Sequence, residues 1–176
     1  VSDDFTPPPP PPPPADAGAA SETTLAPGDW NIFGFGEIIE QVGSDYQFEF
    51  PSDAEDYGGF AVSSTVGENV YPFSFQEDGS VVFTASMVNA DTTATVYFNF
   101  ERKPYPDTVP NYQTSSITLN STTPQTFTIP VPSQGSNTYE SLNFYIEERD
   151  VRINLGDVVI NDDTGLPEER NKVYFV

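Results

Sequence analysis

The chain has 176 residues, of which 27 are acidic and only 6 are basic, and it contains no histidine and no cysteine. The formal net charge of −21 repels nucleic acid phosphates and anionic lipids, so we expect neither nucleic acid nor a membrane as a partner. The missing residue types exclude disulfides, thiolate nucleophiles and histidine-dependent triads. Paired carboxylates can still hydrolyse glycosides, but so many scattered acids form pairs by chance, and we expect no enzymatic activity.

The first 28 residues have the composition of a tail rather than of a folded domain. Eight consecutive prolines, from Pro7 to Pro14, follow a short head whose large apolar side chains are Val1 and Phe5. Proline fixes φ and lacks an N–H group, so this run predicts a stiff polyproline II rod of roughly 25 Å. Alanine, glycine, serine and threonine dominate the stretch that follows, as far as Gly28. We therefore predict an extended head, rod and linker over 1–28 and a folded domain over 29–176.

Beyond residue 29, short apolar segments alternate with turn-forming residues roughly every 8–12 residues, a spacing typical of an antiparallel sandwich or barrel. The predicted strands are 30–35, 46–50, 60–64, 70–75, 81–87, 94–100, 116–119, 126–131, 142–147, 151–160 and 172–176. Strong helical periodicity is absent and aromatic residues are plentiful, so we predict an all-β fold of two packed antiparallel sheets with an aromatic core.

Alternating residue types mark the two faces of the predicted strands. In the strand at 94–100, the apolar residues at even positions share one face, while Tyr97 and Asn99 share the other. One face therefore packs on the core, and the opposite face meets solvent or a partner. The proline-rich stretch 103–110 lacks the N–H donors that a central strand needs, so it predicts a surface loop.

The order of the aromatic motifs resembles that of a known class of binding domain. Trp30 lies in the first predicted strand, an aromatic strand follows at 46–50, and the motifs Tyr57-Gly58-Gly59-Phe60 and Tyr71-Pro72-Phe73 come next. Over about residues 29–163 this texture resembles the jelly-roll carbohydrate-binding modules of secreted polysaccharide-degrading enzymes. The resemblance implies an antiparallel jelly-roll β-sandwich, exposed aromatic platforms on which sugars stack, and in many members a structural calcium ion near a sheet edge.

Four tyrosines lie beside turn-forming or proline-rich stretches and are the candidate sugar platforms: Tyr57, Tyr105, Tyr112 and Tyr139. Trp30 lies within a strand and serves equally well as a core residue. For each of these aromatic residues burial in the core is the interpretation that we favour, because aromatic side chains are the main core filler of small sandwiches.

Two acidic clusters contain oxygen ligands of the kind that calcium takes, at 53–56 and 161–163. Neither follows the spaced calcium loop with glycine at its sixth position. The same Asp and Asn residues also initiate turns, and this is the interpretation that we favour. We expect no cofactor, with a structural calcium ion as the one candidate, and no zinc or transition-metal site because the usual ligands are missing.

The two ends of the chain carry apolar side chains that suggest assembly. An extended apolar tip on a stiff rod can add a strand to an exposed sheet edge of another copy, and such head-to-tail contacts generate an open fibril. The predicted docking residues are Val1, Phe5, Pro7, Pro14, Val173 and Phe175. We predict an extracellular, secreted subunit that assembles with copies of itself. The alternative is a carbohydrate-binding module that the proline run separates from a catalytic domain, with polysaccharide as the partner.

Overall fold

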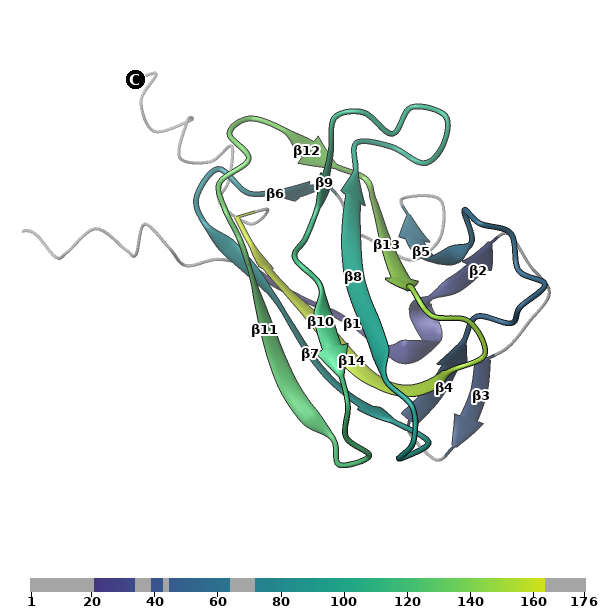
Figure 1. The fold of residues 1–176 in the computed structure, drawn as a ribbon. Helices are drawn as coiled ribbons and strands as arrows, with labels where there is room; N and C mark the ends of the chain where they lie inside the picture. Colours follow the sequence, from purple (N-terminus) through teal and green to yellow (C-terminus); the bar gives the residue numbers. More distant parts are fainter. Residues whose placement is uncertain (1–20, 34–38, 43–44, 64–71, 164–176) are drawn as a thin grey trace, which may run out of the picture.

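The computed structural model describes residues 21–33, 39–42, 45–63 and 72–163, and this part of the chain is an all-β sandwich. Most of its strands form two large sheets, shown in Figure 1, and every described pairing is antiparallel. The predicted fold class, an antiparallel jelly-roll β-sandwich, is confirmed. The predicted polyproline tail lies outside the described residues. Within the described ranges there is no helix that could cross a membrane.

The first sheet, called sheet A here, has six strands. Their spatial order is β11 (Gln125–Val131), β7 (Gly79–Met87), β14 (Arg152–Asp162), β4 (Asp45–Glu49) and β3 (Ile39–Val42), with β1 (Ser21–Leu25) also paired to β14. The long strand β14 pairs with β4 through its first residues and with β1 through its last, so β4 and β1 follow one another along the same edge of β14.

The second sheet, called sheet B, also has six strands and carries the candidate site. Their order is β10 (Ile117–Leu119), β8 (Ala94–Glu101), β13 (Ser141–Ile146), β5 (Gly59–Ser63) and β2 (Asn31–Phe33), with β9 (Asn111–Gln113) also paired to β8. A two-stranded sheet, β6 (Phe73–Ser74) with β12 (Thr138–Tyr139), and a short 3₁₀ helix, η1 (Pro27–Asp29), complete the described fold.

Aromatic rings from both sheets fill the space between them, as the composition predicts. Phe48 of sheet A meets Phe60 of sheet B edge to face, with ring centroids 4.8 Å apart. Trp30 is buried and packs on Phe98 and Phe144 at centroid distances of 6.3 and 6.0 Å, so it is a core residue. Large rings bury much apolar surface and pack best at such offset angles. Their packing therefore holds the two sheets together in a chain without disulfides.

The boundary predicted at residue 29 is wrong for the last part of the linker. Ser21–Leu25 forms β1, which pairs with β14, and the side chain of Leu25 is only 2% exposed. The Ser21 hydroxyl also donates to Asp162 Oδ1 at 2.7 Å. Leu25 is the one large apolar residue of this segment, which is too weak a pattern to predict a strand. Pairing with β14 stabilises the segment as a strand. The sandwich therefore includes residues from Ser21 onward.

Most predicted strands overlap observed ones, and the stretch 103–110 is a loop as predicted. The short strands β3, β9 and β12 were not predicted, since two to four residues show no clear alternation. The strand predicted at 172–176 lies outside the described residues.

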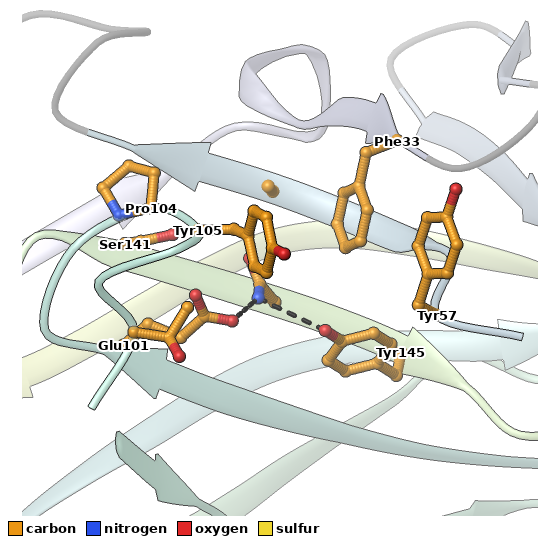
Figure 2. A pocket seen from close by; sticks show the side chains of 10 residues that line it. Phe33, Tyr57, Glu101, Pro104, Tyr105, Ser141 and Tyr145 are labelled. Carbon is orange, nitrogen blue, oxygen red and sulfur yellow. Dashed lines mark hydrogen bonds between the residues drawn. The ribbon is translucent and has the colours of Figure 1, made fainter. Parts of the chain in front are cut away.

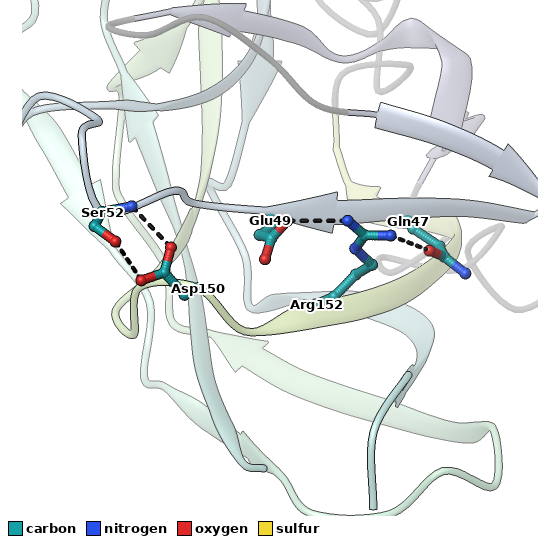
Figure 3. Close-up of polar contacts among 5 residues, drawn as sticks. All are labelled: Gln47, Glu49, Ser52, Asp150 and Arg152. Carbon is teal, nitrogen blue, oxygen red and sulfur yellow. Dashed lines mark hydrogen bonds and ion pairs between the residues drawn. The ribbon is translucent and has the colours of Figure 1, made fainter.

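A tight turn after β13 anchors the loop that leads from β4 to β5 (Figure 3). Asp150 adopts a left-handed backbone conformation with φ of 58°, which aspartate tolerates better than most residues. Its carboxylate accepts hydrogen bonds from the Ser52 amide, at 2.9 Å, and from the Ser52 hydroxyl. Next to it, Arg152 pairs with Glu49 at 3.2 Å. These contacts fix the base of loop 50–58, which carries one wall of the site described next.

Candidate functional site

A groove of about 830 Å³ lies on the outer face of sheet B, the face turned away from the core (Figure 2). Strands β2, β5, β8 and β13 supply its floor, and the loops 102–110 and 50–58 supply its walls. Strand alternation explains the floor: in β13, Leu142 and Phe144 point into the core, so Asn143 and Tyr145 point outward into the groove.

Aromatic rings from three strands form a row across the outer face of sheet B. Phe33 of β2 meets Tyr145 of β13 edge to face, with centroids 6.2 Å apart. Tyr145 in turn stacks on Tyr97 of β8 at 5.2 Å, and the two residues are direct cross-strand partners. Gly59 lies between Phe33 and Tyr145, where an added Cβ would come within 2.7 Å of Phe33 Cζ and 2.8 Å of Tyr145 Cε1. Only glycine lets the two rings approach this closely without rearrangement.

A connected polar network lies beside the aromatic row. The side-chain amide of Asn143 donates to Glu101 Oε1 and, at 3.3 Å, to the Tyr145 hydroxyl. The Asn99 amide donates to the same Glu101 oxygen at 3.2 Å, and Asn111 donates to Asn99 Oδ1 at 3.1 Å. Buried polar groups that satisfy one another in this way hold fixed positions, so the network offers a ligand a rigid set of donors and acceptors.

Burial changes the acid–base behaviour of this network. It raises the pKa of the Glu101 carboxyl, and the hydrogen bonds from Asn99 and Asn143 partly offset that increase because they favour the ionised form. Burial, reinforced by the nearby Glu101 charge, raises the pKa of Tyr145 to about 12. The Tyr145 phenol therefore keeps its proton, and its hydroxyl stays a hydrogen-bond donor, up to a higher pH than an ordinary tyrosine.

Two exposed tyrosines stand on the walls of the groove. Tyr105 is 88% exposed on loop 102–110, and Tyr57 is 67% exposed on loop 50–58. The base of the first loop is closed by the Arg102 amide, which donates to the carbonyls of Thr108 and Pro110, both at 3.1 Å. Large apolar side chains exposed together in one hollow are typical of binding sites. Among the described residues, two of the three most exposed large hydrophobic side chains line this groove.

The structure brings together two of the four tyrosines predicted as platforms, Tyr57 and Tyr105. Tyr112 pairs across strands with the inward-facing Phe100, so its ring is half-buried against the core and does not line the groove. Tyr139 is wrong as a platform: its strand pairs with β6, and its ring is 0% exposed in the core. The predicted docking residues Val1, Phe5, Pro7, Pro14, Val173 and Phe175 lie outside the described residues.

Sequence reasoning missed the floor of the groove, including Phe33, Glu101, Asn143 and Tyr145. A partial signal exists for β13, where Ser141, Asn143 and Tyr145 alternate with apolar residues. Nothing in the sequence, however, shows that this strand lies between β5 and β8.

The acidic residues at the end of β14 serve as acceptors for main-chain amides. Asp162 accepts from the Ser74 amide at 3.0 Å, and Asp163 accepts from the amides of Gln76 and Glu77 at 2.7 and 3.0 Å. Such bonds stabilise the turn that follows β6. In the described part of the chain no group of three or more acidic side chains is arranged to hold a metal ion. A structural calcium ion stays a prediction that these observations do not test.

Comparison with known proteins supports the fold at the level of structure alone. No family model and no curated protein matches the sequence. The xylan-binding domain CBM22-1 of Xyn10C from Paenibacillus barcinonensis is similar in structure, with a TM-score of 0.55 and 15% sequence identity over 84% of this chain and 97% of that one. A variant of the carbohydrate-binding module CBM29-2 solved with mannohexaose has a TM-score of 0.54 and 16% identity, over 80% of this chain and 90% of that one. The predicted resemblance to carbohydrate-binding modules is confirmed as a likeness of fold.

Proposed function

We propose that this domain binds a polysaccharide in the groove on sheet B and that it acts by binding rather than by catalysis. The observation that carries the proposal is the combination of exposed rings and a satisfied polar network in one hollow. A sugar ring has apolar C–H faces and a rim of hydroxyl groups, so it needs aromatic surfaces and polar groups side by side. Concave sites with aromatic walls and a few fixed polar groups are the usual form of small-molecule sites.

The groove supplies both kinds of contact in the required arrangement. Tyr57 and Tyr105 offer exposed ring faces from the two walls, while Tyr145 forms part of the floor (Figure 2). Asn143 and Glu101 line the same groove, and Asn143 Oδ1 and the Glu101 carboxylate can accept hydrogen bonds from sugar hydroxyls. Hydrogen bonds between hydroxyls and an ionised carboxylate are stronger than neutral ones, so the polar floor adds orientation to the stacking.

The structural neighbours suggest which polysaccharides to test. One is described as xylan-binding, and variants of CBM29-2 were solved with mannohexaose and with cellulohexaose. We therefore propose xylan, mannan-type and cellulose-type chains as the ligand candidates for this domain. Since such polysaccharides lie outside the cell, we also propose an extracellular location, to be checked by detecting the protein in the culture medium of its source.

The composition of the groove supports binding without catalysis. Glycoside hydrolysis by the usual mechanism needs two carboxyl groups that flank the scissile bond. Among the described residues that line the groove, Glu101 is the one carboxylate. Incubation with each bound polysaccharide, followed by an assay for new reducing ends, tests this part of the proposal. Release of reducing ends would contradict it.

Affinity electrophoresis tests the binding proposal directly. The domain should migrate more slowly in native gels that contain xylan, glucomannan or hydroxyethyl cellulose than in gels without polymer. The variant Tyr105→Ala should lose most of this retardation. Val109→Ala is the matched control, because Val109 is exposed on the same loop but does not line the groove. Unchanged migration of the wild-type domain on every polymer tested would contradict the proposal.

Fibril formation, predicted from the sequence, is our second proposal. The observation that favours it is the stiff proline run that carries Val1 and Phe5 at its tip. A rod loses little conformational entropy when it docks, because its unbound ensemble is already narrow. Electron micrographs should show long particles for the full chain and single particles for a chain that starts at Ala15. Both proposals can hold together, since a fibril can display sugar-binding domains.

A further inference from the structure

We infer that Glu101 makes the groove select uncharged polysaccharides over polysaccharides that carry carboxylate groups. This inference rests on the proposed function and adds the chemical class of the ligand. It follows from the position of one acidic side chain, from the groups around it and from the absence of basic residues among the described lining of the groove.

Glu101 lies where it is shielded from bulk water yet open to a ligand. It is the last residue of β8 and the cross-strand partner of Ser141, and both residues line the groove. Glu101 is only 8% exposed, and its carboxylate accepts a hydrogen bond from Asn143 of β13. A ligand in the groove would therefore meet this carboxylate with little intervening water.

The hydrogen bonds of Glu101 leave part of its capacity for a ligand. Both amide donors, from Asn99 and Asn143, bind the same oxygen, Oε1. No hydrogen bond to Oε2 occurs among the described residues, so this oxygen can accept from a sugar hydroxyl. A hydroxyl is both donor and acceptor, and it satisfies a carboxylate without adding charge.

A carboxylate on the ligand would instead be repelled. It can only accept hydrogen bonds when ionised, so it cannot pair with Glu101. Two like charges in contact repel strongly where the protein shields one of them from bulk water, as it shields Glu101. Juxtaposed like charges are a common way for a binding site to reject wrong partners.

The described basic residues do not offset this repulsion. Arg102 and Lys103 follow Glu101 in the chain, but both are exposed and neither lines the groove. Arg149 lies over the Phe50 ring at 5.1 Å, and Arg152 pairs with Glu49. An acidic sugar in the groove would thus face Glu101 without a cation from this part of the chain.

Binding measured at low and at high salt distinguishes the repulsion by Glu101 from the repulsion by the net charge of the whole molecule. The net charge of −21 also repels polyanions, but salt screens it, and the screening length falls to about 3 Å at 1 M ionic strength. Direct contact between Glu101 and a ligand carboxylate in the groove is screened much less. Discrimination that persists at high salt therefore reports the groove itself.

The test compares one neutral polymer that binds the domain with the same polymer after carboxymethylation, and uses hydroxyethylation as the steric control. Affinity electrophoresis and calorimetry at 0.05 and 1 M NaCl give the dissociation constants. We expect at least ten-fold weaker binding of the carboxymethyl form at both salt concentrations and comparable binding of the hydroxyethyl form. Glu101→Gln, which keeps the shape but removes the charge, should reduce this discrimination several-fold.

Glu22→Gln is the matched control, because it removes the same charge from the exposed strand β1 on the opposite sheet. It should leave the discrimination at 1 M NaCl unchanged. Equal binding of the neutral and carboxymethyl forms by the wild-type domain at 1 M NaCl would overturn the inference, and so would equal effects of the two substitutions. The wild-type comparison remains decisive if Glu101→Gln fails to fold. Loss of binding to every neutral polymer would instead overturn the proposed function, so the two failures are distinguishable.

Discussion

On both outer faces of the sandwich every second residue of a strand points outward, but the outward side chains of the two sheets differ in kind. On sheet A some outward polar side chains pair across strands: Thr84 and Thr126 share a hydrogen bond of 3.0 Å, and Asn154 donates to the Ser86 hydroxyl at 3.2 Å. On sheet B the outward polar side chains also pair with one another, but aromatic rings and loop 102–110 lie beside them. Polar groups that are already paired gain little from a ligand, whereas exposed rings gain when a ligand covers them. The difference indicates that sheet B is the binding face.

The largest effect should come from the core that both faces share. Phe144 is fully buried and contacts Trp30, Phe48, Phe60 and Phe98. Phe144→Ala leaves a cavity between the sheets and should lower the free energy of unfolding by about 3–5 kcal/mol. Denaturant titration followed by tryptophan fluorescence measures this loss. A change under about 1 kcal/mol would contradict the assigned packing.

Two glycines, one on each sheet, distinguish the faces more sharply. Gly59→Ala on sheet B drives a methyl group into Phe33 and Tyr145, so it should lower the free energy of unfolding by about 1–3 kcal/mol and weaken polysaccharide binding. Gly156→Ala on sheet A meets Thr84 only at ordinary contact distances, the nearest being 3.5 Å. It should leave binding unchanged. Equal effects of both substitutions on binding would argue against the aromatic row as part of the site.

The wall tyrosines should affect binding without affecting stability. Tyr105→Ala removes a ring that is almost fully exposed, so the unfolding free energy should change by less than about 0.5 kcal/mol. Binding should weaken about ten-fold or more, as expected for an aromatic side chain that covers a ligand. Calorimetry and denaturant titration of the same preparation check both parts. Wild-type affinity in this variant would remove Tyr105 from the site.

These expectations depend on contacts that the sequence only partly predicts. Local alternation predicted most strands, because each strand's inward residues are close in sequence. The aromatic row joins residues 33, 97 and 145 from three strands, and their register depends on pairings between distant segments that no local pattern reveals. Tyr139 is a second residue whose position depends on a distant pairing. Its place beside a turn is typical of a surface residue, but its strand pairs with β6 and its ring lies in the core.

The polar network of sheet B predicts an effect of pH on stability. The pKa of Tyr145 rises from 10.0 to about 12 in the folded state, so the folded protein keeps the phenol proton up to a higher pH than the unfolded chain does. Stability should therefore fall as pH rises from about 10 to about 12, by less than about 2.7 kcal/mol because the ring is partly solvated. Tyr145→Phe should lack this component in denaturant titrations across that range. An identical pH dependence in both proteins would contradict the assignment.

The smallest effect is expected on the outer face of sheet A. Thr126→Ala removes a hydrogen bond between exposed hydroxyls, so the free energy of unfolding should change by less than about 1 kcal/mol. Polysaccharide affinity should stay at the wild-type value, as measured by affinity electrophoresis. A several-fold loss of affinity would show that this face takes part in binding.

Nuclear magnetic resonance titration of the ¹⁵N-labelled domain with xylohexaose, mannohexaose and cellohexaose tests the central claim most directly. Our account predicts that at least one oligosaccharide shifts the amide signals of Asn143, Tyr145 and the loop 102–110, while the signals of Thr84 and Thr126 stay in place. Shifts confined to sheet A, or no shifts with any of the three, would contradict a sugar-binding groove on sheet B.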